Sequence, residues 1–383
     1  MKLLVALLAL LQFGPRAPLT PAETLLEPAV LRAIAQQAPA DTGDSVTGTD
    51  SGSDIVVSCA DHQCGTASRA VRKLAALVSA KTLPQPARTI RILSSVTADS
   101  ARQAAAVVHV AEIADRGPQV VRAPWSTAGI GDEAAEVLAR HFAPATEIKS
   151  YESLGQPGFD GYGVSTTTIV ANPSLSGDAA ATIAAATAYF LATLPNAGAE
   201  ALLSHLTVGA HARLAEDGRK AVAQMGNQQR ASADVLIMFG QAIEREQRRM
   251  RSFERFMPTP VDPMLRSRLD DMEKGITSLW TSMGITSSPY VPPAQRIRGR
   301  GGEDLRVPSR TGSGPIKAAE PPTAFLKFEN VNLILFELGN FIDGKRSISD
   351  IRDAVSAEFG SLPIPSVTDY FDRLAKSGAI TIK

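Results

Sequence analysis

The feature that most constrains the fold is an alternation of strand-type and helix-type segments between residues 54 and 226. Short apolar runs of β type occur at Asp54–Ser58, Thr89–Leu93, Ala105–Val110, Gln119–Arg122 and Thr166–Ala171. Segments with the apolar period of amphipathic helices occur at Gly65–Ala80, Gly131–Phe142, Gly177–Leu194 and Ala199–Met225. Strands that alternate with helices favour a largely parallel sheet that is covered by helices. The sequence therefore predicts an α/β sandwich over residues 54–226.

Residues 1–22 have the pattern of a secretory signal peptide. Lys2 precedes the apolar run Leu3–Leu11, which is shorter than the roughly 20 apolar residues that a membrane-spanning helix needs. We therefore expect export to the periplasm or the exterior of a bacterial cell, and no other segment predicts a transmembrane helix. Residues 23–53 follow as a short helix, Glu23–Ile34, and a polar loop.

Residues 227–284 are predicted to be helical. One long helix covers Gln228–Phe256, and a second covers Met264–Met283. The first helix ends in the run EREQRRMRSFERF, in which glutamates are interleaved with arginines. Charges of this kind are typical of a solvated helix face, which is our expectation here; binding of nucleic acid or anionic lipid is the alternative.

Residues 323–383 are predicted to form a small C-terminal module, after a linker at 285–322 that is rich in Pro, Gly, Ser and Arg. Ser347 and Ser366 are each placed to cap a helix. The predicted elements are an apolar segment at Phe325–Phe341, helices at Ile348–Phe359 and Val367–Lys376, and a strand at Ala379–Ile382. Three helices and a strand predict a winged-helix-like module.

The composition excludes several classes of function. Lys plus Arg and Asp plus Glu both total 39, so the formal net charge is zero. This balance argues against a strongly basic nucleic-acid binder, and aromatic residues, at 5%, are too few for a stacking surface. We therefore predict no nucleic-acid partner. The hydrophobic content of 44% fits a soluble globular protein with a sizeable core.

The sequence has two cysteines, Cys59 and Cys64, with four residues between them. Two thiolates are too few for a structural zinc site made of cysteines alone, which needs four. In an exported protein the two could form a disulfide, and a pair of free thiols is the alternative. The spacing leaves both possibilities open.

None of the motifs G-x-S-x-G, H-E-x-x-H, the P-loop or G-x-G-x-x-G occurs in the sequence. Other stretches resemble a known family. Asp61–Ala67 (DHQCGTA) is similar to its D-N-x-S-G-T-A motif, and Tyr162–Thr166 (YGVST) is similar to A-G-[IV]-P-[AT]. Arg88–Leu93 and Val107–Glu112 look like two strands that lead to its carboxylate ligands, and Asp178–Leu194 looks like its last helix.

These stretches resemble the di-zinc exopeptidases of the aminopeptidase S/Y type. The segments Asp343–Ile348 and Ala354–Gly360 resemble a C-terminal extension of some bacterial members. The resemblance implies a three-layer α/β/α sandwich of the zinc-exopeptidase type that holds two zinc ions. It also implies a metallo-aminopeptidase activity, in which a metal-bound water hydrolyses the first peptide bond of a peptide substrate.

Carried over to this sequence, the family's site is incomplete. Asp61 matches the bridging aspartate, and Glu112 matches a further carboxylate ligand. In the place of a Glu-Glu pair stand Ala98 and Asp99, so the general base is missing and Asp99 is the remaining acid. The resemblance thus leaves Asp61, Asp99 and Glu112 as possible metal ligands and assigns no catalytic residue.

Both histidine ligands of the family are also missing. Ser58-Cys59-Ala60 precedes Asp61 where a G-H-x-D motif is expected, and Ala171-Asn172-Pro173-Ser174 stands where the last histidine is expected. His62 and His109 lie close in sequence to Asp61 and Glu112 and are possible substitute ligands. A surface or core position is the alternative for each histidine.

The sequence therefore supports two hypotheses of function. The first is an exported, non-catalytic relative of the zinc aminopeptidases that binds a peptide ligand or acts as a scaffold and has no zinc. The second is an active metallo-exopeptidase that cleaves peptide substrates with zinc on an unusual ligand set, in which His62 or His109 joins the three acids. Carboxylates alone would suit Ca²⁺ or Mg²⁺ better than zinc. An unrelated α/β binding protein is a third interpretation.

Overall fold

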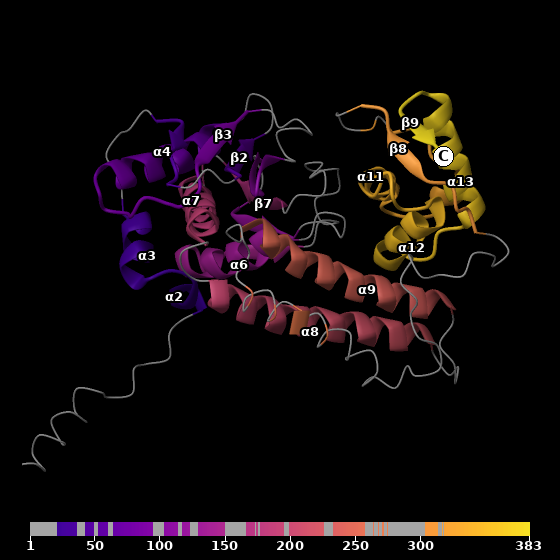
Figure 1. Ribbon diagram of the computed structural model, residues 1–383, viewed down its shortest axis with the longest axis horizontal. Helices are drawn as coiled ribbons and strands as arrows, with labels where there is room; N and C mark the ends of the chain where they lie inside the picture. The colour runs from indigo at the N-terminus through magenta and orange to yellow at the C-terminus, as the bar shows by residue number, and fades with distance from the viewer. Residues whose placement is uncertain are drawn as a thin grey trace, which may run out of the picture.

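The structure is a computed structural model of the whole chain (Figure 1). It describes residues 21–36, 43–49, 53–59, 64–94, 103–113, 117–122, 129–149, 166–172, 174, 177–194, 199–225, 233–256, 263, 267, 270, 271, 274, 303–312, 316 and 318–383. The apolar run of the predicted signal peptide and most of the predicted helix at 264–283 lie outside these ranges. So do Asp61, His62 and Asp99.

The described strands form a seven-stranded sheet in the order β1-β3-β2-β4-β7-β5-β6. Their bounds are β1 Ser45–Val46, β2 Ile55–Cys59, β3 Ile90–Leu93, β4 Ala106–Glu112, β5 Gln119–Val121, β6 Glu147–Lys149 and β7 Thr166–Ala171. Strands β3, β2, β4 and β7 are parallel, β1 is antiparallel to β3, and β5 is antiparallel to β7. The predicted α/β fold with a largely parallel sheet is confirmed.

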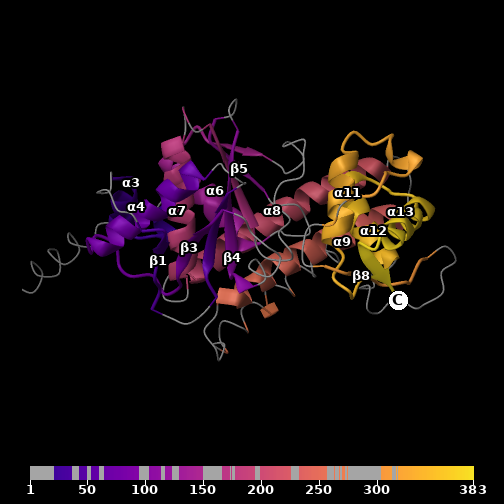
Figure 2. The same cartoon turned by 90° about the horizontal axis from the view of Figure 1, so that it is seen from above.

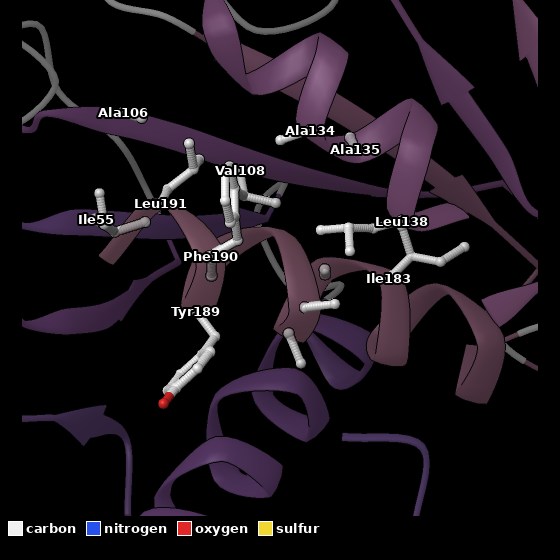
Figure 3. Packing of buried hydrophobic residues seen from close by; sticks show 14 of the residues in the cluster. Ile55, Ala106, Val108, Ala134, Ala135, Leu138, Ile183, Tyr189, Phe190 and Leu191 are labelled. Atoms are coloured by element: carbon white, nitrogen blue, oxygen red, sulfur yellow. The ribbon is translucent and has the colours of Figure 1, made fainter. Parts of the chain in front are cut away.

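Three helices lie side by side on one face of this sheet: α4 (Gly65–Ser79), α7 (Gly177–Thr193) and α6 (Ile130–Phe142). The central helix, α7, contacts β2, β4 and β7 as well as both neighbouring helices. Figure 3 shows Ile183, Phe190 and Leu191 of α7 packed toward the strands and toward Leu138 of α6. Because α7 packs on several sides, its alanine-rich sequence is buried nearly all round.

Two short helices, α2 (Pro21–Leu25) and α3 (Pro28–Ala35), pack on this helical layer. They replace the single helix that was predicted for Glu23–Ile34, because Pro28 begins a new helix at its first turn. In the described part of the chain, no helix combines the length and the apolar character that crossing a membrane requires.

Two long helices, α8 (Ala199–Met225) and α9 (Ala233–Arg251), pack along each other and reach from the sheet to the C-terminal module (Figures 1 and 2). Helix α9 continues as a 3-10 turn, η2 (Ser252–Phe256), at the amino ends of the parallel strands. There Arg88 donates to the carbonyl oxygens of Ser53 and Arg255, each at 2.9 Å. These bonds fix the end of α9 to the segments that enter β2 and β3.

The charged run in α9 is not a solvated face, which corrects the expectation from the sequence. Arg245, Glu246 and Arg249 are only 5%, 0% and 3% exposed. They belong to a cluster of charged side chains from α6, α8 and α9, here called the Glu246 cluster, whose members are Asp132, Glu133, Arg213, Asp217, Arg245, Glu246 and Arg249. The sequence pattern does not show this burial, because Arg213 and Asp217 of α8 and Asp132 of α6 complete the ionic cluster from other parts of the chain.

Glu246 lies at the centre of this cluster. Its carboxylate oxygens lie 2.8 Å from Nη2 of Arg213, 2.5 Å from Nη2 of Arg245 and 3.7 Å from Nε of Arg249. Arg213 also pairs with Glu133 of α6. Burial by itself raises the pKa of Glu246, but the surrounding arginines outweigh burial and hold the pKa at about 2.

The C-terminal module has an apolar core of its own. Its elements are β8 (Pro308–Arg310), η4 (Thr323–Phe325), α11 (Val331–Asn340), α12 (Ile348–Phe359), α13 (Ile364–Lys376) and β9 (Ile380–Ile382), and β8 pairs antiparallel with β9. The predicted cap at Ser347 is confirmed, and Asp350 completes a capping box. The predicted cap at Ser366 is wrong, because Pro365 is accepted in the first turn and α13 begins earlier. The winged-helix likeness stays a prediction.

The module packs on α9 and on the sheet. Helix α12 lies against α9, and the guanidinium of Arg248 in α9 lies 5.2 Å from the ring centroid of Phe341. Leu333 of α11 is buried against Val121 of β5 and Val170 of β7. Since Ile169 and Ala171 face the helical layer, the alternation along β7 places Val170 on the opposite face. In the described part, α11 therefore covers some of the face that the three helices leave open. A complete third layer stays a prediction.

We predict that Glu246→Gln lowers the free energy of unfolding by about 3–5 kcal/mol, because it removes one partner of a buried ionic cluster and leaves three arginines under-neutralised. Urea unfolding at pH 7 measures this loss. The matched control is Glu216→Gln on α8, where the glutamate pairs with Arg219 at the surface. That change is expected to cost at most about 1 kcal/mol.

The same variant also carries a pH signature. The folded pKa of Glu246, about 2, lies below that of an unfolded glutamate, so ionised Glu246 stabilises the fold at neutral pH. The difference between wild type and Glu246→Gln is thus expected in full above about pH 5 and to shrink as the pH falls toward 2. A difference that stays constant over this range would contradict the account of the cluster.

Candidate functional site

The candidate site lies at the carboxyl ends of the parallel strands β2, β3 and β4, because the predicted ligands Asp61, Asp99 and Glu112 follow or end these strands in the sequence. Parallel strands bring these ends to one edge of a sheet, and α/β proteins bind ligands at such edges. Of the three predicted metal ligands, Asp61 and Asp99 lie outside the described residues. The structure describes Glu112, which is the last residue of β4.

Glu112 is bonded to the start of α4. Its Oε1 accepts a hydrogen bond from the backbone N–H of Thr66, the second residue of the helix, at 2.7 Å. The first N–H groups of a helix have no partner within the helix, and the helix dipole favours a negative charge beside them. Glu112 therefore acts as the acceptor for an N-terminus that has no side-chain cap of its own.

A disulfide joins Cys59 to Cys64, with their Cα atoms 5.3 Å apart. Of the two possibilities left open by the spacing, the structure has the bonded one. Cys59 ends β2, and Cys64 is the N-cap residue of α4. The end of β2 is therefore tied covalently to the same helix start that Glu112 holds by a hydrogen bond.

The first turns of α4 and α7 are also linked to each other. Nη2 of Arg69 donates to Oγ1 of Thr66 at 3.1 Å, and Nε of Arg69 lies 3.6 Å from the carboxylate of Asp178. One turn further on, Lys73 donates to Oγ1 of Thr182 at 3.2 Å. Burial lowers the pKa of Lys73, and the negative charge of Asp178 opposes that shift. The edge is thus lined by paired side chains from both helices.

His109 does not lie beside Glu112. The two residues are three positions apart in β4, so their side chains leave opposite faces of the strand. His109 pairs across the sheet with Ser58 of β2, whose Oγ lies 2.9 Å from Nδ1 of the ring. The ring is only 9% exposed, and burial lowers its pKa to about 4, so it is neutral at pH 7. The sequence could have predicted this separation of His109 from Glu112, because successive side chains of a strand point to opposite faces of the sheet.

The described His, Cys, Asp and Glu side chains do not form a metal site by themselves. Among the described residues, no group of three or more His, Cys, Asp or Glu side chains is arranged to hold a metal ion. Cys59 and Cys64 are bonded to each other, and a disulfide sulfur is not the thiolate that binds zinc. Because Asp61, His62 and Asp99 lie outside the described residues, the predicted ligand set stays a prediction.

Comparisons with known proteins give little further support. No family model matches the sequence, and no curated protein matches it. Among solved structures, the chain is similar to one described as a "putative peptidase" from Clostridium acetobutylicum, at 11% sequence identity and a TM-score of 0.24. The match covers 88% of this chain and 59% of that one, so the chain spans about three fifths of its length.

We predict that His109 makes the fold sensitive to mild acid. The unfolded histidine takes up a proton near pH 6.5, whereas the folded one does so near pH 4, so stability falls as the pH drops from 6.5 to 4. The loss amounts to roughly 3 kcal/mol. Urea unfolding at several pH values measures it, and His109→Gln is expected to remove this part of the pH dependence.

The control for this measurement is His211→Gln, which changes an exposed histidine on α8. This variant should keep the pH dependence of the wild-type protein. If His109→Gln and His211→Gln show the same slope between pH 6.5 and 4, His109 is not neutral and buried in the fold.

Proposed function

We propose that this protein is an exported, non-catalytic relative of the zinc aminopeptidases that binds a peptide ligand or serves as a scaffold. The observation that carries the proposal is the attachment of two strand ends to one helix at the carboxyl edge of the sheet. There the Cys59–Cys64 disulfide and the bond from Thr66 to Glu112 attach the ends of β2 and β4 to the start of α4. In a working metal site, side chains at this edge would instead converge on the ions.

The chemistry of a di-zinc site supports the same proposal. Such a site needs several His and carboxylate ligands and a free carboxylate that takes a proton from the metal-bound water. In this sequence Ala98 stands at the place of that base, and cysteine and small residues stand where the first histidine is expected. Loss of a general base typically costs a factor of about 10²–10⁴ in rate.

Two features support export. Lys2 is followed by the apolar run Leu3–Leu11, a pattern that is typical of a signal peptide. The disulfide between Cys59 and Cys64 is of the kind that persists in oxidising compartments such as the periplasm or the exterior. The two features are independent, because one depends on hydropathy and the other on the fold.

The alternative function is an active metallo-exopeptidase with an unusual ligand set. One observation favours it: a carboxylate that accepts a backbone hydrogen bond through one oxygen can still bind a metal through the other, as ligands fixed by outer partners do. Oε1 of Glu112 accepts the hydrogen bond from the N–H of Thr66, so Oε2 is the oxygen that a metal could bind. The experiment must therefore separate a structural Glu112 from a metal-binding one.

The test is the zinc content of the protein after equilibration with zinc and dialysis, for the wild type and for Asp61→Ala, Glu112→Gln and Glu112→Ala. The proposal predicts no stoichiometric zinc in any of the four. It also predicts that Glu112→Ala lowers the free energy of unfolding by about 0.5–2 kcal/mol through loss of the helix-terminal acceptor. Glu112→Gln keeps an acceptor and should lose less.

One result of the zinc measurement would contradict the proposal. Stoichiometric zinc in the wild type that is lost in Asp61→Ala and Glu112→Gln would overturn the proposal and establish a metal centre at this edge. It would also justify a screen of aminoacyl substrates for exopeptidase activity.

A further inference from the structure

The disulfide at the carboxyl edge joins two residues of unequal exposure. Cys59 is only 4% exposed, whereas Cys64 is partly exposed. In thiol–disulfide exchange a thiolate attacks one of the two sulfur atoms, and access to that atom decides which one. A reductant in solution therefore reaches Cys64 before it reaches Cys59.

The place of Cys64 in the fold also suits exchange. It is the N-cap residue of α4, a helix of 15 residues. The positive end of a helix stabilises a thiolate beside it. The carboxylate of Glu112, which accepts a hydrogen bond from the N–H of Thr66, opposes this stabilisation of a thiolate by its negative charge. The same hydrogen bond keeps one N–H at the helix start bonded when the disulfide is open.

The buried sulfur of Cys59 lies near a hydrogen-bond acceptor for the thiol that reduction would produce. Sγ of Cys59 lies 3.7 Å from the carbonyl oxygen of Leu93 in the neighbouring strand β3. A disulfide sulfur has no hydrogen, whereas a thiol can donate a weak hydrogen bond to such a carbonyl. Reduction therefore leaves a buried thiol that the surrounding strands already accommodate.

We infer that Cys59–Cys64 is a redox latch, a disulfide that exchanges with thiol reductants through Cys64 and whose opening loosens the start of α4. The inference concerns sulfur chemistry and the motion of one helix end. It goes beyond the proposed function and does not depend on it, since it holds whether or not the edge binds a metal.

The exchange proceeds in two balanced steps. A thiolate of a dithiol reductant attacks Sγ of Cys64; a new S–S bond forms, the Cys59–Cys64 bond breaks, and Cys59 leaves as a thiolate that takes a proton from water. The second thiolate of the reductant then attacks the reductant's other sulfur atom, which is bonded to Sγ of Cys64 in the mixed disulfide. This attack expels Cys64 as a thiolate. The reductant ends as a cyclic disulfide, and the protein gains two electrons.

Opening the latch removes the covalent bond between the end of β2 and the start of α4. The hydrogen bond from Thr66 to Glu112 remains, and so do the contacts of α4 with α7 and the sheet. The fold is thus retained, while the first turn of α4 exchanges between closed and open states more readily. The carboxyl edge is the part of the protein whose shape depends on the redox state.

Two matched variants test which sulfur is accessible. Cys59→Ser leaves Cys64 as the only thiol, and Cys64→Ser leaves Cys59. Under native conditions, iodoacetamide should alkylate Cys64 in the first variant at least about tenfold faster than Cys59 in the second. Equal rates in two folded variants, as judged by circular dichroism, would overturn the assignment of Cys64.

A measurement on the wild-type protein keeps the test independent of how the variants fold. After incubation with reduced glutathione and acid trapping, peptide mapping should find the mixed disulfide on Cys64. Amide exchange in the reduced protein should be at least about tenfold faster at Thr66 and Ser68, whose N–H groups are hydrogen-bonded to Glu112 and to the carbonyl oxygen of Cys64, and unchanged in α13. A disulfide that resists glutathione until the protein unfolds, or an unchanged exchange rate at Thr66 and Ser68, would overturn the latch. Neither result bears on the zinc content that tests the proposed function.

Discussion

The buried carboxylate of Glu246 holds together parts of the chain that are far apart in sequence. It sits among Arg213 of α8 and Arg245 and Arg249 of α9. Through Arg249 the cluster reaches Asp132 of α6, which lies 117 positions away in the sequence. Each arginine would be costly to bury without a negative partner, so the packing of α6, α8 and α9 on one another depends on this ionic cluster.

The two edges of the parallel sheet are closed in different ways. At the amino edge, Arg88 and Arg255 donate to backbone carbonyl oxygens and fix η2, which continues α9. At the carboxyl edge, the Cys59–Cys64 disulfide and the bond from Thr66 to Glu112 fix α4. The first closure serves the assembly of the fold. The second occupies the place where parallel α/β proteins usually keep their reactive groups, and it is the basis of both proposals made for this protein.

Local patterns in the sequence predict most of the regular elements, because burial on one side produces a period that can be counted. Strand Thr166–Ala171 and helix Ile348–Phe359 have the predicted bounds. The strands β1 and β6 were missed, since each contains a single apolar residue, Val46 or Ile148, and therefore no apolar run. The sequence could not predict the burial of Glu246 or the bond between Glu112 and Thr66, because each depends on a partner that only the folded chain brings near. Asp61 and Asp99 lie outside the described residues, so their roles stay predictions.

Glu112 is assigned here a structural role at the start of α4 and not a role as a metal ligand. A crystal structure of the wild-type protein grown with zinc, with anomalous scattering recorded at the zinc edge, tests this claim most directly. The structural role predicts that Glu112 still accepts the hydrogen bond from the N–H of Thr66 and that the disulfide stays closed. It also predicts no anomalous peak beside Glu112. A peak within about 2.0–2.2 Å of its carboxylate, with further ligands from the strand ends, would contradict the account.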